Sequence, residues 1–355
     1  MATTPLFTAI VHTFNRPALL KLAVEALLRQ TYTNLEIILI NNGATPETVE
    51  YLKEVSSQDT RIKLINYAEN QFSWDDPLKY ISVCWNAALE SATGDYVWIQ
   101  EDDDLISDDY AGKMVSLFQE NPECTTAAGL MVGIDEAGNK VNTAPRVSNF
   151  RSRFMPGHLL ALDYLRGGRI VFSAPGTIFT FKRDVLINAG GFNRSIVLSQ
   201  MYGIVPFGVT GFDETALCYW RYHPDTLNRK LSTAGWIGIK ENLAMIDEWD
   251  INGRWQGFGA DIAQEIVTRL KAEESNTSAS WFLISLNHCR FKASWRILSK
   301  IWTHPRFWLK VVGLTPSINP LNRTLRPVVR LALKLLPGIA NRSPWLNKIR
   351  DRVNR

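Results

Sequence analysis

The run Glu101-Asp102-Asp103-Asp104 is the part of this 355-residue sequence whose residue types most directly suggest chemistry. Adjacent carboxylates repel one another, and a divalent cation relieves that repulsion. Carboxylate oxygens select Mg²⁺ or Mn²⁺, which commonly keep one or two protein carboxylates together with substrate phosphates. The alternative is a solvated acidic turn that leads into a helix beginning near Asp108 and Asp109. Because the run follows an apolar strand, we expect the cation site.

The first strand-to-helix turn excludes one large class of nucleotide-binding proteins. The apolar stretch 6–11 predicts a strand, and it is followed by His12-Thr13-Phe14-Asn15-Arg16-Pro17. A dinucleotide-binding Rossmann domain places G-x-G-x-x-G at this turn, so that the backbone can approach a pyrophosphate. This turn contains no glycine, which disfavours an NAD enzyme. Something other than a bare helix terminus must neutralise a phosphate bound here.

The elements that position these residues alternate between strand and helix. Apolar runs predict strands at 6–11, 35–40, 61–65 and 96–99, and helical spacing or helix starts lie between them. Such alternation over about 130 residues indicates a mostly parallel open sheet with helices on both faces. Ligands of such sheets bind beyond the carboxyl ends of the strands, where the acidic run falls.

Composition indicates an ordinary globular protein with an uneven distribution of charge. Hydrophobic residues make up 46% and charged residues 21%, which excludes disordered and collagen-like classes. The four cysteines are far apart, which argues against a zinc module or a disulfide scaffold. The net charge is +4, but residues 281–355 hold 15 Lys or Arg and one acid, so the preceding part is acidic. A basic tail indicates an anionic partner.

The tail itself favours a membrane surface over nucleic acid. Arg326, Arg330 and Lys334 recur every fourth residue on one helical face, with Trp and Leu elsewhere in the tail. This pattern is typical of a helix that lies on an anionic membrane. The alternative is a helical subdomain with a tryptophan core. We expect no nucleic-acid partner, because no recognition motif accompanies the charges.

The start of the chain lacks a secretory signal, and no apolar run approaches the ~18 residues of a membrane span. We therefore expect a cytoplasmic protein, peripheral on the cytosolic face of a membrane.

Residues 6 to about 225 resemble the nucleotide-sugar glycosyltransferases of the GT-A fold, specifically the family 2 type. The resemblance rests on five segments that occur in the order and at roughly the spacing typical of that family. They are 11–17 (VHTFNRP), 38–43 (ILINNG), 86–97 (Asn-Ala-Ala followed by Gly-Asp-Tyr-Val), 101–105 (EDDDL) and 189–192 (AGGF).

The resemblance implies a donor site at the strand ends. Thr13, Asn15 and Arg16 would line the nucleotide, and Asn41 and Asn42 would face its base. An asparagine side chain offers both a donor and an acceptor to a pyrimidine edge. The alternative for the asparagine pair is a simple turn after a strand, which Asn and Gly favour in any case.

The same resemblance assigns the acidic run to the DxD motif of the family. Asp103 would ligate a Mn²⁺ or Mg²⁺ ion that bridges the diphosphate, and Asp102 would lie near the ribose and the metal shell. Glu101 would be a further metal residue. His223, in a segment similar to a late Tyr-Arg-x-His segment of the family, could complete the metal or diphosphate site. Its alternative is a hydrogen-bonded turn residue before a proline.

The sequence departs from the family pattern between residues 70 and 86, where the connection is longer than usual. Trp85 stands where the family often has an arginine. Lys79 is the candidate to supply the lost positive charge, and its alternative is a solvated lysine at a helix start.

A second departure concerns the catalytic base, which must be able to take a proton from the acceptor hydroxyl. The family often carries an acidic pair soon after Gly-Gly-Phe, but residues 193–211 contain no acid, and Ser199-Gln200 fills the region. Asp213 and Glu214 are the next carboxylates. They are either a displaced acidic pair that includes the base or the turn before the final strand.

These features predict an α/β protein with a GT-A fold: a Rossmann-like, mostly parallel open sheet flanked by helices, with a helical basic C-terminal extension. We expect a catalytic domain at 1–230 (donor half to about 130, acceptor half from about 131), a helical extension at 231–280 with a linker at 271–280, and a membrane-associating tail at 281–355. The expected function is metal-dependent, inverting transfer of a sugar from a nucleoside diphosphate donor to a hydroxyl of a glycan or lipid-linked acceptor. The alternatives are a non-catalytic nucleotide-sugar or glycan binder and a membrane-anchored scaffold.

Overall fold

A computed structural model describes residues 4–141, 152–166, 178–193, 196–223, 226, 230–231, 239–287 and 291–301. Its nine-stranded sheet has the order β3-β2-β1-β4-β8-β6-β9-β5, with β7 beside β9. The strands are β1 (Phe7–Thr13), β2 (Leu35–Asn42), β3 (Ile62–Tyr67), β4 (Tyr96–Glu101), β5 (Leu105–Ile106), β6 (Cys124–Ile134), β7 (Phe154–Pro156), β8 (Phe179–Lys182) and β9 (Val209–Arg221). The helices that precede β9 are α1 (Pro17–Leu28), α2 (Pro46–Gln58), the π-helical turn η1 (Ile81–Trp85), α3 (Asn86–Ser91), α4 (Tyr110–Glu120), α5 (Gly157–Leu165), α6 (Arg183–Asn188), α7 (Ile196–Gly203) and the 3₁₀ turn η2 (Val205–Phe207).

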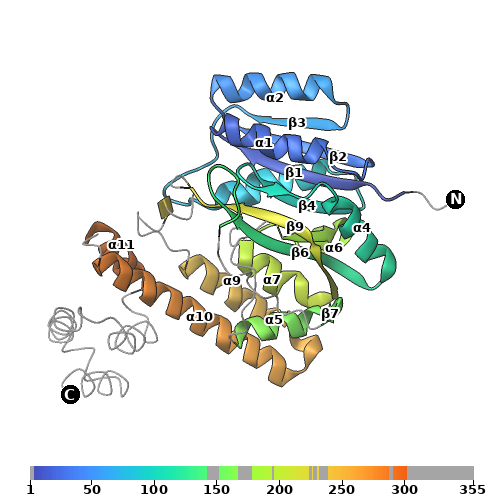
Figure 1. Ribbon diagram of the computed structural model, residues 1–355. Coiled ribbons are helices and arrows are strands. Elements are labelled where there is room, and N and C mark those ends of the chain that lie inside the picture. The colour runs from blue at the N-terminus through green and yellow to red at the C-terminus, as the bar shows by residue number, and fades with distance from the viewer. Residues whose placement is uncertain are drawn as a thin grey trace, which may run out of the picture. The chain divides into compact units, whose positions relative to one another are not determined.

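The first four strands of the sheet form a parallel block, as the alternating pattern predicts. β1 pairs in parallel with both β2 and β4, and β2 pairs in parallel with β3. Every residue of β2 is buried, as expected for a strand covered on both faces. Figure 1 shows β3, β2, β1 and β4 following one another across the sheet. Because β6 and β9 run in the same direction, six of the nine strands are parallel, and the predicted fold class is confirmed.

The register of the parallel block brings the carboxyl ends of its strands together. His12 near the end of β1 lies opposite Glu101 at the end of β4, and Thr13 lies opposite Asn41 near the end of β2. The turn that follows β1 and the acidic run that follows β4 therefore begin at the same edge of the sheet.

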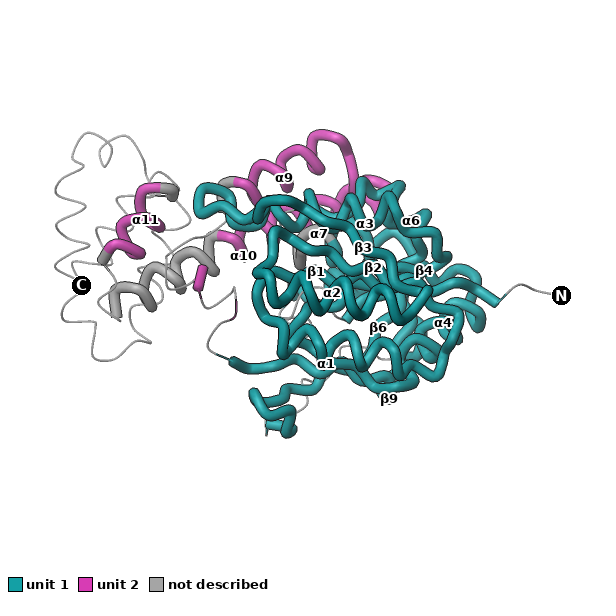
Figure 2. Tube along the Cα trace, turned by 90° about the horizontal axis from the view of Figure 1, so that it is seen from above, with its two compact units in different colours: residues 1–223 teal, residues 224–355 magenta. Residues whose placement is uncertain are grey.

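The chain divides into two compact units, residues 1–223 and 224–355, which Figure 2 colours separately. In the described part of the second unit, α10 (Ala260–Asn287) packs with α9 (Ile239–Ile251), the 3₁₀ turn η3 (Gln256–Phe258) and α11 (Phe291–Ile301). Trp249 and Trp255 pack edge to face, with ring centroids 5.7 Å apart. The expectation of a linker at 271–280 was wrong, because α10 continues through it. None of the helices in the described ranges is long and apolar enough to cross a membrane.

Candidate active site

Five polar side chains from three distant segments meet beyond the carboxyl ends of β1 and β4. The Arg16 guanidinium forms hydrogen-bonded ion pairs with Asp102 through Nη2 and with Asp103 through Nη1. Thr13 Oγ1 donates a hydrogen bond to Asp102 Oδ2 at 2.7 Å. From the end of the first unit, His223 Nε2 lies 2.9 Å from Asp103 Oδ2. We call Thr13, Arg16, Asp102, Asp103 and His223 the acidic cluster.

The pKa values of the two aspartates in the acidic cluster are shifted in opposite directions. Burial raises the pKa of Asp102 to about 6, against the opposing effects of Arg16 and Thr13. Burial acts in the same sense on Asp103, but the hydrogen bond with His223 and the charge of Arg16 outweigh it and lower the pKa of Asp103. Both carboxylates are therefore mainly ionised at neutral pH, and the cluster holds two negative charges on either side of the positive charge of Arg16.

Arg221 anchors the turn formed by the acidic run through hydrogen bonds to Asp103 and Asp104, a role that the sequence did not predict. This arginine at the end of β9 is only 2% exposed. Its Nε donates to the Asp103 carbonyl at 2.9 Å, and its backbone N donates to Asp104 Oδ1 at 3.0 Å. Its Nη1 donates to the carbonyls of Asp135 and Glu136. The Tyr-Arg-x-His segment contains this arginine, but the sequence predicted a function only for its histidine.

His12 and Tyr80 form a second feature beside the cluster that the sequence did not reveal. Their ring centroids lie 4.7 Å apart. Burial lowers the pKa of His12 to about 3, with a smaller contribution from the charge of Arg16, so the ring is neutral. His12 Nε2 is buried without a hydrogen-bond partner. A buried polar atom of this kind calls for a ligand or a water molecule.

The predicted metal residues are brought together only in part. Asp103 and His223 meet, whereas burial and the neighbouring aspartates raise the pKa of Glu101 well above its usual range. In the ranges that the structure describes, no three His, Cys, Asp or Glu side chains gather to hold a metal ion. This donor set fits a cation that takes its remaining ligands from phosphate oxygens and water, rather than one held in a closed protein cage.

The predicted nucleotide residues outside the cluster have structural partners or face solvent. Asn41 Nδ2 donates to Asn66 Oδ1, and Asn41 Oδ1 accepts from the backbone N of Ala44. Asn42 Nδ2 donates to Asn70 Oδ1 at 3.0 Å, and its Oδ1 accepts from the backbone N of Gln71. The pair thus anchors the turn after β2 and the long connection that follows β3. Asn15 and Lys79 are exposed.

Asn86 joins the Gly-Gly-Phe turn to the donor half of the sheet. Its side chain donates to the Phe192 carbonyl at 2.9 Å and accepts from the Phe192 backbone N at 2.7 Å. Gly191 has a positive φ of 73°, and a Cβ there would lie 2.4 Å from Asn86 Oδ1. Gln200 on the following helix α7 is 2% exposed, and its Nε2 has no partner.

Asp213 and Glu214 are not brought to the acidic cluster. Asp213 pairs with Gly129 on β6, and Arg221 pairs with Ile134 on the same strand. Gly129 and Ile134 are five residues apart, which corresponds to about 16 Å along β6. Asp213 Oδ1 accepts from Thr215 N and Oγ1, and Oδ2 lies 3.4 Å from Arg153 Nη1. These contacts lower the pKa of Asp213 despite its burial. Glu214 is exposed beside it. The pair therefore lies within β9, beside the register shift between Gly129 and Leu130 of β6, and not in a turn before the final strand.

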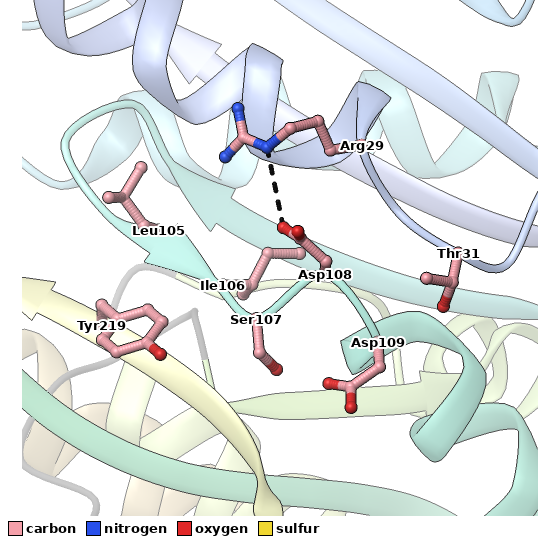
Figure 3. A pocket seen from close by; sticks show the side chains of 8 residues that line it. All are labelled: Arg29, Thr31, Leu105, Ile106, Ser107, Asp108, Asp109 and Tyr219. Carbon is pink, nitrogen blue, oxygen red and sulfur yellow. Dashed lines mark ion pairs between the residues drawn. The ribbon is translucent and has the colours of Figure 1, made fainter.

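A hollow on the surface lies between the end of α1 and the segment that follows the acidic run (Figure 3). Its two carboxylates already face basic side chains: Arg29 Nε lies 3.7 Å from Asp108 Oδ1, and Lys113 Nζ lies 2.6 Å from Asp109 Oδ2. None of the acidic cluster lines this hollow.

Solved structures with the same fold include a mannosyltransferase and a protein in complex with UDP-GlcNAc. The chain superposes on S. aureus TarS 1–349 in complex with UDP-GlcNAc with a TM-score of 0.54 and 13% identity, covering 98% of this chain and 88% of that one. It superposes on the mannosyltransferase PcManGT from Pyrobaculum calidifontis, in complex with GDP-Man and Mn²⁺, with a TM-score of 0.50 and 15% identity, covering 91% and 84%. At these identities the likeness shows the GT-A fold.

Sequence comparison gives the family. Two uncharacterized glycosyltransferases of Haemophilus influenzae are 30% identical over 117 residues and 32% identical over 125 residues. These matches cover 33% and 35% of this chain, and 44% and 36% of the relatives, so each spans less than half of the relative's length. Residues 8–189, just over half of the chain, match the glycosyl transferase family 2 model, and the chain therefore belongs to that family.

Proposed function

We propose that the protein transfers a sugar from a nucleoside diphosphate donor to a hydroxyl of a glycan or lipid-linked acceptor, with inversion and with a divalent cation. The observation that carries this proposal is the acidic cluster at the carboxyl ends of β1 and β4, the edge where open α/β sheets bind ligands. The solved structures of the same fold hold GDP-Man with Mn²⁺ and UDP-GlcNAc, which supports a donor of this class.

The chain's own residues would divide the work as follows. Asp103 and His223 would hold the Mn²⁺ or Mg²⁺ ion, which when bound supplies positive charge opposite the leaving diphosphate. Thr13 orients Asp102, and Arg221 keeps the acidic turn rigid. Arg16 carries the positive charge that a diphosphate requires, on a planar fork suited to phosphate oxygens. The acceptor hydroxyl would attack the anomeric carbon from the side opposite the diphosphate, the bond between that carbon and the diphosphate would break, and the hydroxyl proton would pass to solvent water.

The test is Asp103→Asn in the full-length protein, after a thermal-shift panel of UDP-, GDP- and dTDP-sugars with Mn²⁺ has identified the donor. We expect release of the nucleoside diphosphate to fall about a hundredfold or more, because the cation loses a charged ligand. The melting temperature should change little, because an asparagine can still accept the His223 hydrogen bond. Asp108→Asn is the matched control, since Asp108 is exposed and pairs only loosely with Arg29. Full activity of Asp103→Asn would refute the metal role.

One observation favours a second candidate, a nucleotide-sugar binder without catalysis. Gln200 lies in the region where the resemblance places the acidic pair, and a buried amide cannot take a proton from a hydroxyl. Donor hydrolysis separates the two functions. An enzyme releases nucleoside diphosphate from the bound donor in a Mn²⁺-dependent manner, whereas a binder shows a donor-dependent thermal shift and no release.

We further propose that the protein acts as a peripheral protein at the cytosolic face of a membrane, bound through residues 281–355. In the described part of that region, Lys292, Trp295 and Arg296 are exposed together on α11, and Trp295 is 71% exposed. The opposite face of α11 buries Ala293 and Ile297. The predicted helix with Arg326, Arg330 and Lys334 lies outside the described residues.

A further inference from the structure

Arg16 lies between the two aspartates to which a cation would bind. Its two terminal nitrogens contact Asp102 Oδ1 and Asp103 Oδ2, while Thr13 occupies the other oxygen of Asp102. The Arg16 Nη1 atom also lies 3.5 Å from His223 Nε2, so the guanidinium faces both Asp103 and His223. An arginine side chain is not deprotonated in proteins, and two carboxylates contact this one. The guanidinium is therefore a permanent cation at this place.

In this arrangement the charge of Arg16 opposes the binding of a free divalent cation. A metal ion entering the cluster would compete for the Asp103 oxygen that Arg16 and His223 contact, and it would be repelled by the guanidinium. A donor diphosphate changes the balance, because it offers Arg16 new oxygens in a geometry that suits its fork. The Arg16 side chain is 28% exposed, so part of the guanidinium-bearing chain is open to an incoming ligand.

We propose that Arg16 is an internal counter-cation that takes the place of the divalent cation in the free protein and moves to the donor's diphosphate when both bind. The cation then enters together with the diphosphate and not before it. This inference rests on the proposed function, and it adds a binding order and a residue that enforces it.

The test measures binding of Mn²⁺ alone to full-length wild type, Arg16→Gln and Arg16→Lys, from the EPR signal of free Mn²⁺. We expect Arg16→Gln to bind Mn²⁺ about tenfold more tightly than wild type, because the competing charge is gone. Arg16→Lys should be intermediate, since an ammonium keeps the charge but cannot bridge both carboxylates. Arg29→Gln, which removes an exposed arginine paired with Asp108, should match wild type. Melting curves establish that each variant is folded.

The same titrations with UDP or GDP complete the experiment. Nucleoside diphosphate should raise the Mn²⁺ affinity of wild type about tenfold or more, and Arg16→Gln should show a smaller gain, because it has lost a contact to the diphosphate. Equal affinity of wild type and Arg16→Gln for Mn²⁺ alone would overturn the counter-cation role. If Arg16→Gln does not fold, equal affinity of wild type and Arg16→Lys would overturn it. Absence of any joint binding of Mn²⁺ and a nucleoside diphosphate would instead contradict the proposed function, while the comparison with Mn²⁺ alone would still decide the role of Arg16.

Discussion

At the scale of single residues, adjacent Asp102 and Asp103 show how neighbours in the chain acquire different roles. The Asp102 side chain is 2% exposed and has both oxygens occupied, by Arg16 and Thr13. The Asp103 side chain is 13% exposed and faces His223. Both carboxylates contact Arg16, but the second oxygen of Asp102 accepts from Thr13, whereas Asp103 lies beside His223, which the proposed function assigns to the cation.

Asp213 is the residue for which the structure changes the expectation most. We expect Asp213→Asn to keep nucleoside diphosphate release within about threefold of wild type, because the side chain lies about 16 Å along β6 from the level of Arg221. The melting temperature should fall slightly, since the contact with the half-exposed Arg153 is weak. Glu214→Gln, an exposed neighbour, is the control. A hundredfold loss of turnover in a folded Asp213→Asn variant would restore it as the catalytic base.

At the scale of elements, β2 is held to its surroundings by one buried carboxylate. Glu36 is 5% exposed. It accepts hydrogen bonds from Thr8 Oγ1 on β1 at 2.6 Å and from Thr93 N and Oγ1 before β4 at 2.8 and 2.7 Å. It also pairs with Lys63 on β3. One side chain thus connects β2 to β1, to β3 and to the segment before β4.

This connection should make stability depend on pH. Burial alone would raise the pKa of Glu36, but the four bonds lower it to about 2 from 4.5. The stabilisation is therefore complete above pH 4.5 and is lost as the pH falls toward 2. We expect Glu36→Gln to lower the free energy of unfolding by about 2 kcal/mol at pH 7, a value reduced because Lys63 is half exposed, and by much less at pH 3. Urea denaturation at both pH values checks this. An equal loss at both would mean that shape, not charge, is what Glu36 contributes.

At the scale of the whole molecule, charge is separated along the chain. Residues 281–355 carry 15 Lys or Arg and one acid, and the rest has an excess of acids. The described portion of that region shows how the charge is displayed, since α11 packs on α10 and α9 and leaves Lys292, Trp295 and Arg296 exposed. Basic residues beside an exposed tryptophan are typical of helices at a membrane interface.

Charge reversal on α11 tests the membrane proposal without removing any segment. We expect Lys292→Glu with Arg296→Glu to weaken co-sedimentation with phosphatidylglycerol-containing vesicles about tenfold or more, since each basic residue near the surface contributes about 1 kcal/mol. Lys21→Glu with Lys53→Glu makes the same change in net charge on exposed residues of the first unit. Equal weakening by both pairs would mean that only net charge matters. Unchanged binding of the α11 variant would remove α11 from the contact.

Local patterns in the sequence were sufficient for the class of fold and for part of the site. The apolar runs at 6–11, 35–40 and 96–99 became β1, β2 and β4, because burial on both faces requires such runs. The acidic run was expected beyond a strand end and lies there. The linker predicted at residues 271–280 is instead part of α10. A polar, serine-rich composition does not exclude a helix.

What only the tertiary structure decided is which distant residues meet. Arg16 contacts Asp103 across 87 positions, and His223 contacts it across 120. Arg221 anchors the turn, and Asp213 lies away from it, although both belong to β9. The amino-acid sequence by itself determined the periodicity of the elements, the chemistry of the acidic run and the separation of charge, since these depend on neighbours along the chain. Contacts within the acidic cluster depend on strand order and register, which arise from the packing of the whole sheet and are not written in any local pattern.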